Sequence, residues 1–265
     1  MPDFLPYLAA ALLYAAVAYN QWRRPVLQYP RLERFTVAAG LVLHGWLLSS
    51  DAVVDGGINF GLSNAVSAIL WLTVMIYWLS SLRLDLHALQ AFVLPPAALA
   101  VLLQTLAPEG HMLPYTNNAL FGVHLLIALL AYSLFTFAAL HAGLMALAER
   151  NLHGKKTLLR LPDFPPIMPM ERLLFQIITT GFVLLTLTLV SGIVFTEQLF
   201  NQPLQFNHKS VFSIAAWLIF GALLWGRRTY GWRGRTAIRW TLSGFGVLLL
   251  AYVGSKFVLE IILGR

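Results

Sequence analysis

Seven histidines are the side chains of this sequence best suited to bind a metal, because the chain contains no cysteine. Without cysteine there is no disulfide, thiolate nucleophile or cysteine-anchored iron–sulfur cluster. Neutral imidazole nitrogens are axial ligands of haem iron, and imidazole also accepts copper and zinc. The sequence contains no hydrolase triad, P-loop, HExxH or glycine-rich dinucleotide motif. We therefore expect a binding protein and not an enzyme.

The composition is that of an integral membrane protein. Hydrophobic residues make up 58% of the chain and charged residues 11%, whereas a soluble domain averages about 45–50% and about 25%. So few charges cannot cover a surface exposed to water. This excludes a soluble globular enzyme, a disordered protein and a nucleic-acid partner, in spite of a formal net charge of +7. The lipid bilayer is therefore the first partner that the sequence implies.

Eight stretches are long and apolar enough to cross a bilayer, which takes about 20 residues. The stretches are continuous and do not alternate, so helices are favoured over a barrel. We predict an all-α integral membrane protein with eight transmembrane helices in a single polytopic domain, residues 1–265. The apolar cores are Phe4–Tyr19, Phe35–Ser50, Leu62–Leu82, His87–Leu106, Ala119–Ala148, Leu173–Phe200, Val211–Trp225 and Ile238–Leu263.

The basic residues predict the orientation of these helices. The connections after the first, third, fifth and seventh spans, with the residues that flank them, hold 15 of the 18 Lys and Arg. The positive-inside rule places these connections in the cytoplasm, so both termini should be extracytoplasmic. Asp3 precedes the first span, and Arg23 and Arg24 follow it. This is the reverse of a secretory signal peptide, so we expect the first span to stay uncleaved.

Three histidines are predicted to lie near the extracytoplasmic side, and an ionisable group inside a membrane is a functional hypothesis by default. With a rise of about 1.5 Å per residue, His124 lies about 8 Å below the outer end of its helix. His44 has a comparable depth, and His208 opens the seventh span. If their rings converge, they can bind a metal ion. The alternative is that a transmembrane histidine forms hydrogen bonds between helices, or that His208 is solvated at the interface.

Two lysines have a similar pair of interpretations. Lys256 precedes Glu260 by four residues, which allows a partial ion pair on one helix face. Its ammonium group could meet a haem propionate or another anionic ligand, or it could extend to the interface. Lys209, beside His208, has the same two possibilities. In the fourth span, Pro95-Pro96 predicts a kink, which we interpret as a packing feature.

Several runs of residues resemble one known family. They are Val123–Tyr132, Ser191–Val194, Ala216–Ile219, Gly231–Arg235 and Gly244-Phe245. They look like the corresponding stretches of the cytochrome c assembly (CcsA/CcmC-type) family of haem-handling membrane proteins. The first four spans, including residues 57–63, look more like its YpjD/HemX-like branch. The resemblance implies that His124 is a haem ligand on the non-cytoplasmic side.

The sequence departs from that family at two places. The Trp-rich WWD segment between the sixth and seventh spans is replaced by Pro203–Ser210, and only Lys209 of its pattern remains. The second flanking histidine, expected near Tyr252, is also missing. These departures argue against haem export to apocytochrome. They leave haem binding with His44 or His208 as the other ligand.

Together, these features predict a multi-pass protein of the bacterial cytoplasmic (inner) membrane that binds or handles haem in cytochrome maturation, with membrane or cytochrome-maturation partner proteins. The predicted cofactor-binding residues are His124, His44, His208 and Lys256, with His124 and His44 as metal ligands. A cofactor-free regulatory or scaffolding subunit is the alternative, favoured by the missing WWD segment. A small-solute transporter, suggested by Pro95-Pro96 and Lys256, ranks last.

Overall fold

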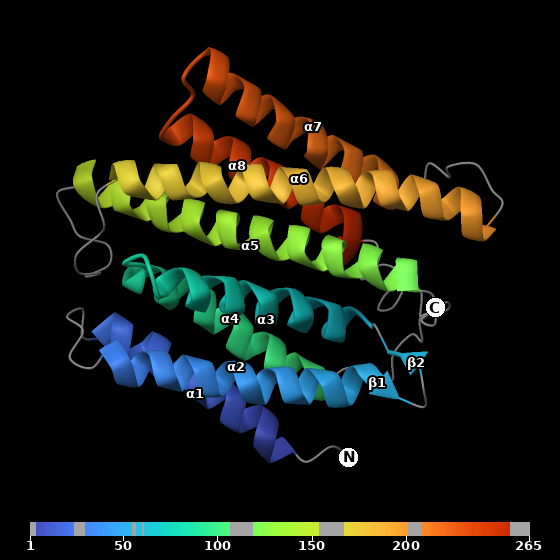
Figure 1. Ribbon diagram of the computed structural model, residues 1–265. Coiled ribbons are helices and arrows are strands. Elements are labelled where there is room, and N and C mark those ends of the chain that lie inside the picture. The colour runs from blue at the N-terminus through green and yellow to red at the C-terminus, as the bar shows by residue number, and fades with distance from the viewer. Residues whose placement is uncertain are drawn as a thin grey trace. The chain divides into compact units, whose positions relative to one another are not determined.

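The structure is a computed structural model that describes residues 4–23, 30–54, 57–59, 61–106, 119–153, 167–200 and 208–254. These residues form eight α-helices and one π-helix, so the all-helical class is confirmed (Figure 1). One short antiparallel pair of strands follows the second helix. The elements are α1 (Phe4–Arg23), α2 (Pro30–Ala52), β1 (Val53–Val54), β2 (Gly57–Ile58), α3 (Leu62–Ser81), α4 (His87–Leu106), α5 (Ala119–His153), α6 (Ile167–Phe200), α7 (His208–Thr229), α8 (Arg235–Leu249) and the π-helix η1 (Leu250–Gly254).

Five of the helices, α3 to α7, are long and apolar enough to cross a membrane. The chain is therefore a multi-span membrane protein. α2 carries charged residues in its first turns and at its end, and the described part of α8 has only 15 residues. The predicted continuation of the last span to Leu263 lies outside the described residues. The count of eight spans and the extracytoplasmic termini stay predictions.

The chain divides into two compact units, which we describe separately. Unit 1 contains α1 to α4 and, within 143–170, the second part of α5 and the beginning of α6. Unit 2 contains the first part of α5, the rest of α6 from Glu171, and α7, α8 and η1.

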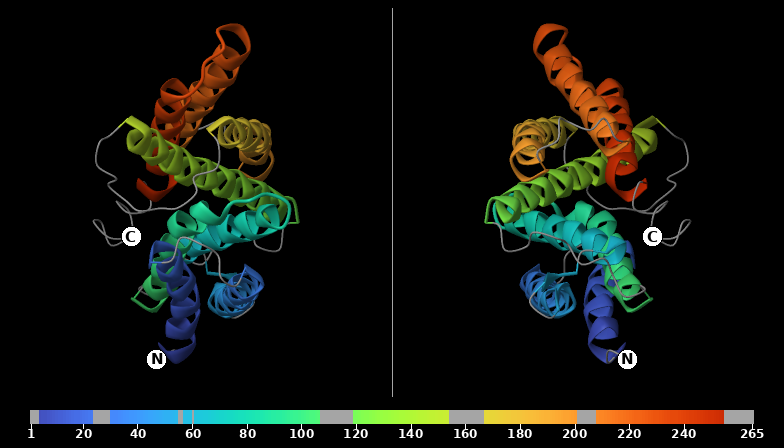
Figure 2. Two further views of the ribbon diagram at one scale, coloured as in Figure 1. Left: turned by 90° about the vertical axis from the view of Figure 1, so that its left-hand side faces the viewer. Right: turned by 90° about the vertical axis from the view of Figure 1, so that its right-hand side faces the viewer.

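In unit 1, α1 packs against α4 and α2, and α3 packs against α4 and α2 (Figure 2). Pro95 lies inside α4, and a proline offers no N–H to the carbonyl four residues earlier. That carbonyl belongs to Ala91, and the Trp22 indole N–H of α1 donates to it at 3.3 Å. The neighbouring helix therefore satisfies a backbone acceptor that the proline would leave unpaired in lipid.

In unit 2, α8 packs along α7, and the core is centred on two aromatic rings (Figure 2). Phe135 of α5 stacks on Phe220 of α7 with their centroids 3.9 Å apart, and both side chains are fully buried. Gly181 of α6 and Gly244 of α8 lie against these rings, where a Cβ atom would come within 3.2 Å of Phe135 and 2.9 Å of Phe220. Gly244 is thus a packing residue.

Candidate functional site

His124 of α5 is paired with a serine of α6 in unit 2. Its Nδ1 lies 2.7 Å from Ser191 Oγ, and Ser191 Oγ donates its hydrogen to the Leu187 carbonyl at 2.7 Å. A hydroxyl has one hydrogen, so this oxygen can only accept from the imidazole. These hydrogen bonds assign the proton of His124 to Nδ1 and its lone pair to Nε2. Fixing the tautomer through the other ring nitrogen is how proteins orient histidine ligands.

The surroundings of His124 come from three further segments. The backbone of α6 approaches the ring at Gly192, where a Cβ would lie 3.6 Å from Cε1. Lys209, the second residue of α7, interacts electrostatically with His124. Its Nζ lies 5.3 Å from the ring centroid of Tyr252 in η1, and Tyr252 in turn packs on Tyr132 of α5. These ends of α5, α6, α7 and η1 lie together at one end of unit 2 (Figure 1).

The other residues predicted for this site have different outcomes. His208 is the first residue of α7, beside Lys209, and its side chain is exposed. Lys256 lies outside the described residues. Tyr252 stands where the resemblance led us to expect a second histidine, and its ring packs between Tyr132 and Lys209. The described part of unit 2 therefore brings His124 and Lys209 together and places His208 at the same end.

His44 lies in unit 1 and is fully buried. Its Nε2 is 2.8 Å from Ser67 Oγ of α3, and its Nδ1 is 3.4 Å from the Tyr14 hydroxyl of α1. The Tyr14 ring also meets the imidazole edge-on, with centroids 5.9 Å apart. The ring thus connects α2 to two neighbouring helices, which is the interhelical role of a transmembrane histidine. In this arrangement a metal could bind only after one hydroxyl had been displaced.

A second polar group in unit 1, the Glu33 cluster, was not foreseen from the sequence. It consists of Asn20, Gln21, Glu33, Tyr77 and Gln90, and all but Asn20 are buried. Glu33 accepts hydrogen bonds from the Asn20 amide at 2.7 Å and the Gln90 amide at 3.0 Å. Gln90 also donates to Gln21 at 3.1 Å and accepts from Tyr77 at 3.0 Å. The signal that could have revealed it is the presence of amides and one carboxylate in otherwise apolar helices.

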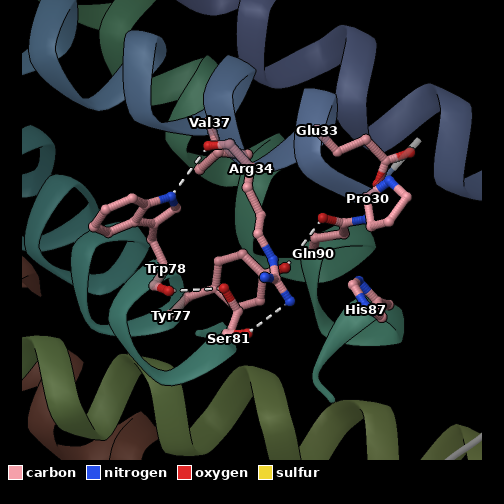
Figure 3. Close-up of a pocket in the computed structure, with 9 residues that line it drawn as sticks. All are labelled: Pro30, Glu33, Arg34, Val37, Tyr77, Trp78, Ser81, His87 and Gln90. Carbon is pink, nitrogen blue, oxygen red and sulfur yellow. Dashed lines mark hydrogen bonds between the residues drawn. The ribbon is translucent and has the colours of Figure 1, made fainter. Parts of the chain in front are cut away.

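A small cavity adjoins the Glu33 cluster (Figure 3). Arg34 reaches across it and donates to the Ser81 carbonyl at 3.3 Å, while the Trp78 indole donates to the Arg34 carbonyl at 3.1 Å. The cavity measures about 10 Å³, which is room for about one water molecule. It is far too small for a cofactor, so the cluster is best understood as a link among α1, α2, α3 and α4.

The opposite end of unit 2 is held by an ion-pair cluster of Glu171, Arg227 and Arg233. The buried Glu171 Oε1 accepts from Arg227 Nη1 at 2.6 Å and from Arg233 Nε at 3.0 Å. Arg233 belongs to the connection between α7 and α8, which turns at Gly231 and Gly234, with φ of 66° and 51°. These positive φ values favour glycine. The residues 231–235 of the resemblance therefore form a turn tied to the first turns of α6.

Comparisons with known proteins agree with the pattern of helices and motifs. The family model described as "Cytochrome C assembly protein" matches residues 33–263. The inner membrane protein YpjD of Escherichia coli (strain K12) is 34% identical over 247 residues, which cover 91% of this chain and 89% of YpjD. The cytochrome c biogenesis protein CcsA of Prochlorococcus marinus is 24% identical over 230 residues in strain AS9601, covering 76% of this chain and 74% of the relative.

A shorter match, to CcsA of Prochlorococcus marinus strain NATL1A, is 30% identical over 92 residues, covering 35% of this chain and 29% of the relative. The likeness to YpjD covers nearly the whole chain, in agreement with the branch that the first four spans resemble. Because the family match begins in α2 and ends beyond η1, this chain belongs to the cytochrome c assembly protein family.

Proposed function

We propose that this protein binds haem at the His124 end of unit 2, as a non-catalytic haem-handling component of cytochrome maturation in the bacterial inner membrane. Membership of the cytochrome c assembly family supports the process. The name of its relative YpjD, an inner membrane protein, supports the location. That of CcsA, a cytochrome c biogenesis protein, supports the role.

The observation that carries this proposal is the hydrogen bond between His124 and Ser191. When bound, haem would supply an iron atom that accepts imidazole nitrogens as ligands. With Nδ1 protonated and held by Ser191, His124 presents its lone pair on Nε2 in a defined direction. Half-burial of the imidazole keeps it accessible from one side. Lys209 adds a positive charge close to the ring, which suits the carboxylates of a propionate-bearing macrocycle.

His208 would suit the role of a further iron ligand better than His44 would. It begins α7 directly before Lys209, in the same unit as His124, and its side chain is exposed. His44 has a hydroxyl on each of its nitrogens. Ligation by His44 would therefore break at least one buried hydrogen bond, whereas His208 has no such cost.

The test is the visible spectrum of the full-length protein, purified after expression with haem supplied. We expect a Soret band in the wild type and at least about a tenfold loss of bound haem in His124→Ala, because loss of a residue that only orients a metal ligand already costs about 10–100-fold. His87→Ala is the matched control, because this histidine lies in unit 1 beside Asp85 and should leave the band unchanged. A wild type without a Soret band, or equal bands in all three proteins, would contradict the proposal.

The second candidate function is a cofactor-free scaffolding subunit. It is favoured by the replacement of the WWD segment by Pro203–Ser210, which removes the tryptophans and the Asp that mark family members that deliver haem. This function predicts a stoichiometric partner protein and no chromophore in the same purification.

A further inference from the structure

Unit 2 has a shallow cavity at its arginine-rich end, away from His124. It is lined by Arg172, Phe175, Gln176, Thr179 and Thr180 of α6 and by Arg227 of α7, and its volume is about 590 Å³. The ion-pair cluster of Glu171, Arg227 and Arg233 adjoins it, since Arg227 belongs to both. The cavity is open on one side, so a ligand can enter it from the surroundings of the helices.

The charges around this cavity are almost all positive. Glu171 is the only carboxylate in the described residues 171–193 and 208–254. It is occupied by Arg227 and Arg233, and Arg227 is also held 4.5 Å over the ring of Phe175. Arg172, in contrast, is exposed and has no ion-pair partner among the residues that the structure describes. The lining therefore offers two guanidinium groups to an anion: that of Arg227, which is held in place, and that of Arg172, whose charge is not paired within the described part of the chain.

The chemistry of the lining selects guanidinium groups as the donors. The hydroxyls of Thr179 and Thr180 already donate to the carbonyls of Phe175 and Gln176 in their own helix, so they cannot also donate to an anion. The side-chain amide of Gln176 and the guanidinium groups of Arg172 and Arg227 remain. Of these, only the guanidinium groups are charged, and they match the paired oxygens of a phosphate.

An apolar stripe leads away from the cavity along α6. Val183, Leu187 and Val190 are exposed, and their spacing continues the face of Gln176 and Thr179 by steps of three and four residues. From Thr179 to Val190 the helix rises about 16 Å, which is close to half of the hydrocarbon core of about 30 Å. A molecule with its phosphate at Arg172 would therefore have apolar surface of the right length for one acyl chain.

We infer that this cavity binds an anionic phospholipid, with its phosphate between Arg172 and Arg227 and one acyl chain along Val183, Leu187 and Val190. Basic pockets at the cytoplasmic side of membrane helices bind anionic lipid head groups, and the positive-inside rule assigns this end to the cytoplasm. The site is separate from His124, and it does not depend on haem binding.

The test measures lipid binding to the full-length protein in detergent by native mass spectrometry. The probes are phosphatidylglycerol and phosphatidylcholine with the same acyl chains. We expect tighter binding of phosphatidylglycerol, and about a fivefold loss of that preference in Arg172→Gln. Arg239→Gln is the matched control, because it removes the same charge from the exposed face of α8, outside the cavity. Its preference should equal that of the wild type.

Three results would overturn the inference. Equal affinity for the two lipids would show that the anionic group is not recognised. Equal losses in Arg172→Gln and Arg239→Gln would show only the general attraction of a basic surface. Full competition by inorganic phosphate at the concentration of the lipid would show a phosphate site to which the acyl chain contributes nothing. Arg172 is exposed, so both variants should keep the elution volume of the wild type.

Discussion

The two units handle polar side chains in different ways. In unit 1, buried polar side chains form hydrogen bonds with one another, and their partners are uncharged. Examples are the Glu33 cluster and the surroundings of His44. In unit 2, some polar groups such as His141 and Glu171 are buried, but His124, Lys209 and Arg172 at its two ends keep exposed or half-buried side chains. Closed networks rigidify a fold, whereas polar groups left accessible at a helix end are available to a ligand. This difference in accessibility is the reason why both proposed binding sites lie in unit 2.

Two of the histidines, His44 and His124, make this contrast concrete. His44 is fully buried, and each of its nitrogens has a hydroxyl partner. His124 is half-buried and has its Nδ1 fixed by Ser191. The sequence alone predicts a comparable depth in the membrane for both. The two rings nevertheless differ in burial: the ring of His44 is enclosed in the core, whereas part of the ring of His124 is exposed.

Replacing His44 by alanine should have the largest effect on stability. His44→Ala removes a fully buried side chain and leaves the hydroxyls of Tyr14 and Ser67 without their partner. We expect a loss of about 3 kcal/mol in the free energy of unfolding. His124→Ala should cost less than about 1 kcal/mol, because its site is partly open. Unfolding by SDS in mixed micelles, followed by circular dichroism, measures both.

The same two variants separate stability from binding. The fraction of His44→Ala that remains folded should retain haem as the wild type does, while His124→Ala loses it. If His44→Ala abolished haem binding in protein that is still folded, His44 would be part of the site and the division between the units would be wrong.

The two buried glutamates should respond differently to loss of charge. Glu171→Gln removes the anion that pairs with Arg227 and Arg233, and we expect a cost of about 2 kcal/mol. Glu33→Gln keeps the shape of a side chain whose partners are neutral amides. It should cost about 1 kcal/mol, since the partly exposed Asn20 amide can turn to offer its oxygen.

The dependence of stability on salt concentration is the control for these two glutamate variants. The stability of the wild type should fall slightly with added salt, because the exposed guanidinium of Arg233 is screened, and Glu171→Gln should lose that dependence. A larger cost for Glu33→Gln than for Glu171→Gln would show that unit 1 depends on the charge of its buried carboxylate.

Two glycines in the helices test how closely the core of unit 2 is packed. In Gly244→Ala the new Cβ would lie 2.9 Å from Phe220 and 3.1 Å from Ile219, so the stacked aromatic core must move. We expect a cost of about 1.5–2 kcal/mol. In Gly246→Ala, two residues further along α8, the Cβ would meet nothing within 4 Å, so stability should be unchanged or rise by up to about 1 kcal/mol through helix propensity. Equal shifts in Tm in the two glycine variants would contradict the close packing described at Gly244.

Much of the fold was predictable because hydrophobicity alone delimits membrane helices. The fourth span was predicted as His87–Leu106, and α4 has the same ends. A run of about 20 apolar residues has few alternatives in lipid, since every backbone group must be paired within the helix. The strand pair Val53↔Ile58 was not predicted, because two-residue strands leave no periodic pattern.

The sites were less predictable, because hydrogen-bond partners come from other helices. The sequence predicted a comparable depth for His124 and His44 and gave no partner for either. Only the structure shows that His124 pairs with Ser191, and His44 with Tyr14 and Ser67. Such pairs are 67, 30 and 23 residues apart in the chain, and no local spacing encodes them. The hydrogen bond from the Trp22 indole to the Ala91 carbonyl, four residues before Pro95, likewise joins residues that are distant in the sequence.

Replacing Ser191 by alanine should have the smallest effect on stability. It tests whether the hydrogen bond to His124 matters for binding. Ser191→Ala removes the acceptor for the His124 Nδ1 proton. Under the proposed function we expect about tenfold weaker haem retention, equal to about 1.4 kcal/mol. Stability should stay within about 0.5 kcal/mol, because the serine is only partly buried. Haem titration followed at the Soret band measures the affinity.

Ser191→Thr is the matched control, because it keeps the hydroxyl on α6 and the side chain can still donate to the carbonyl one turn earlier. Its haem affinity should therefore match that of the wild type. Wild-type affinity in Ser191→Ala, together with loss of haem in His124→Ala, would show that the ring is oriented without the serine. In that case the tautomer of His124 would have to be fixed by the ligand itself.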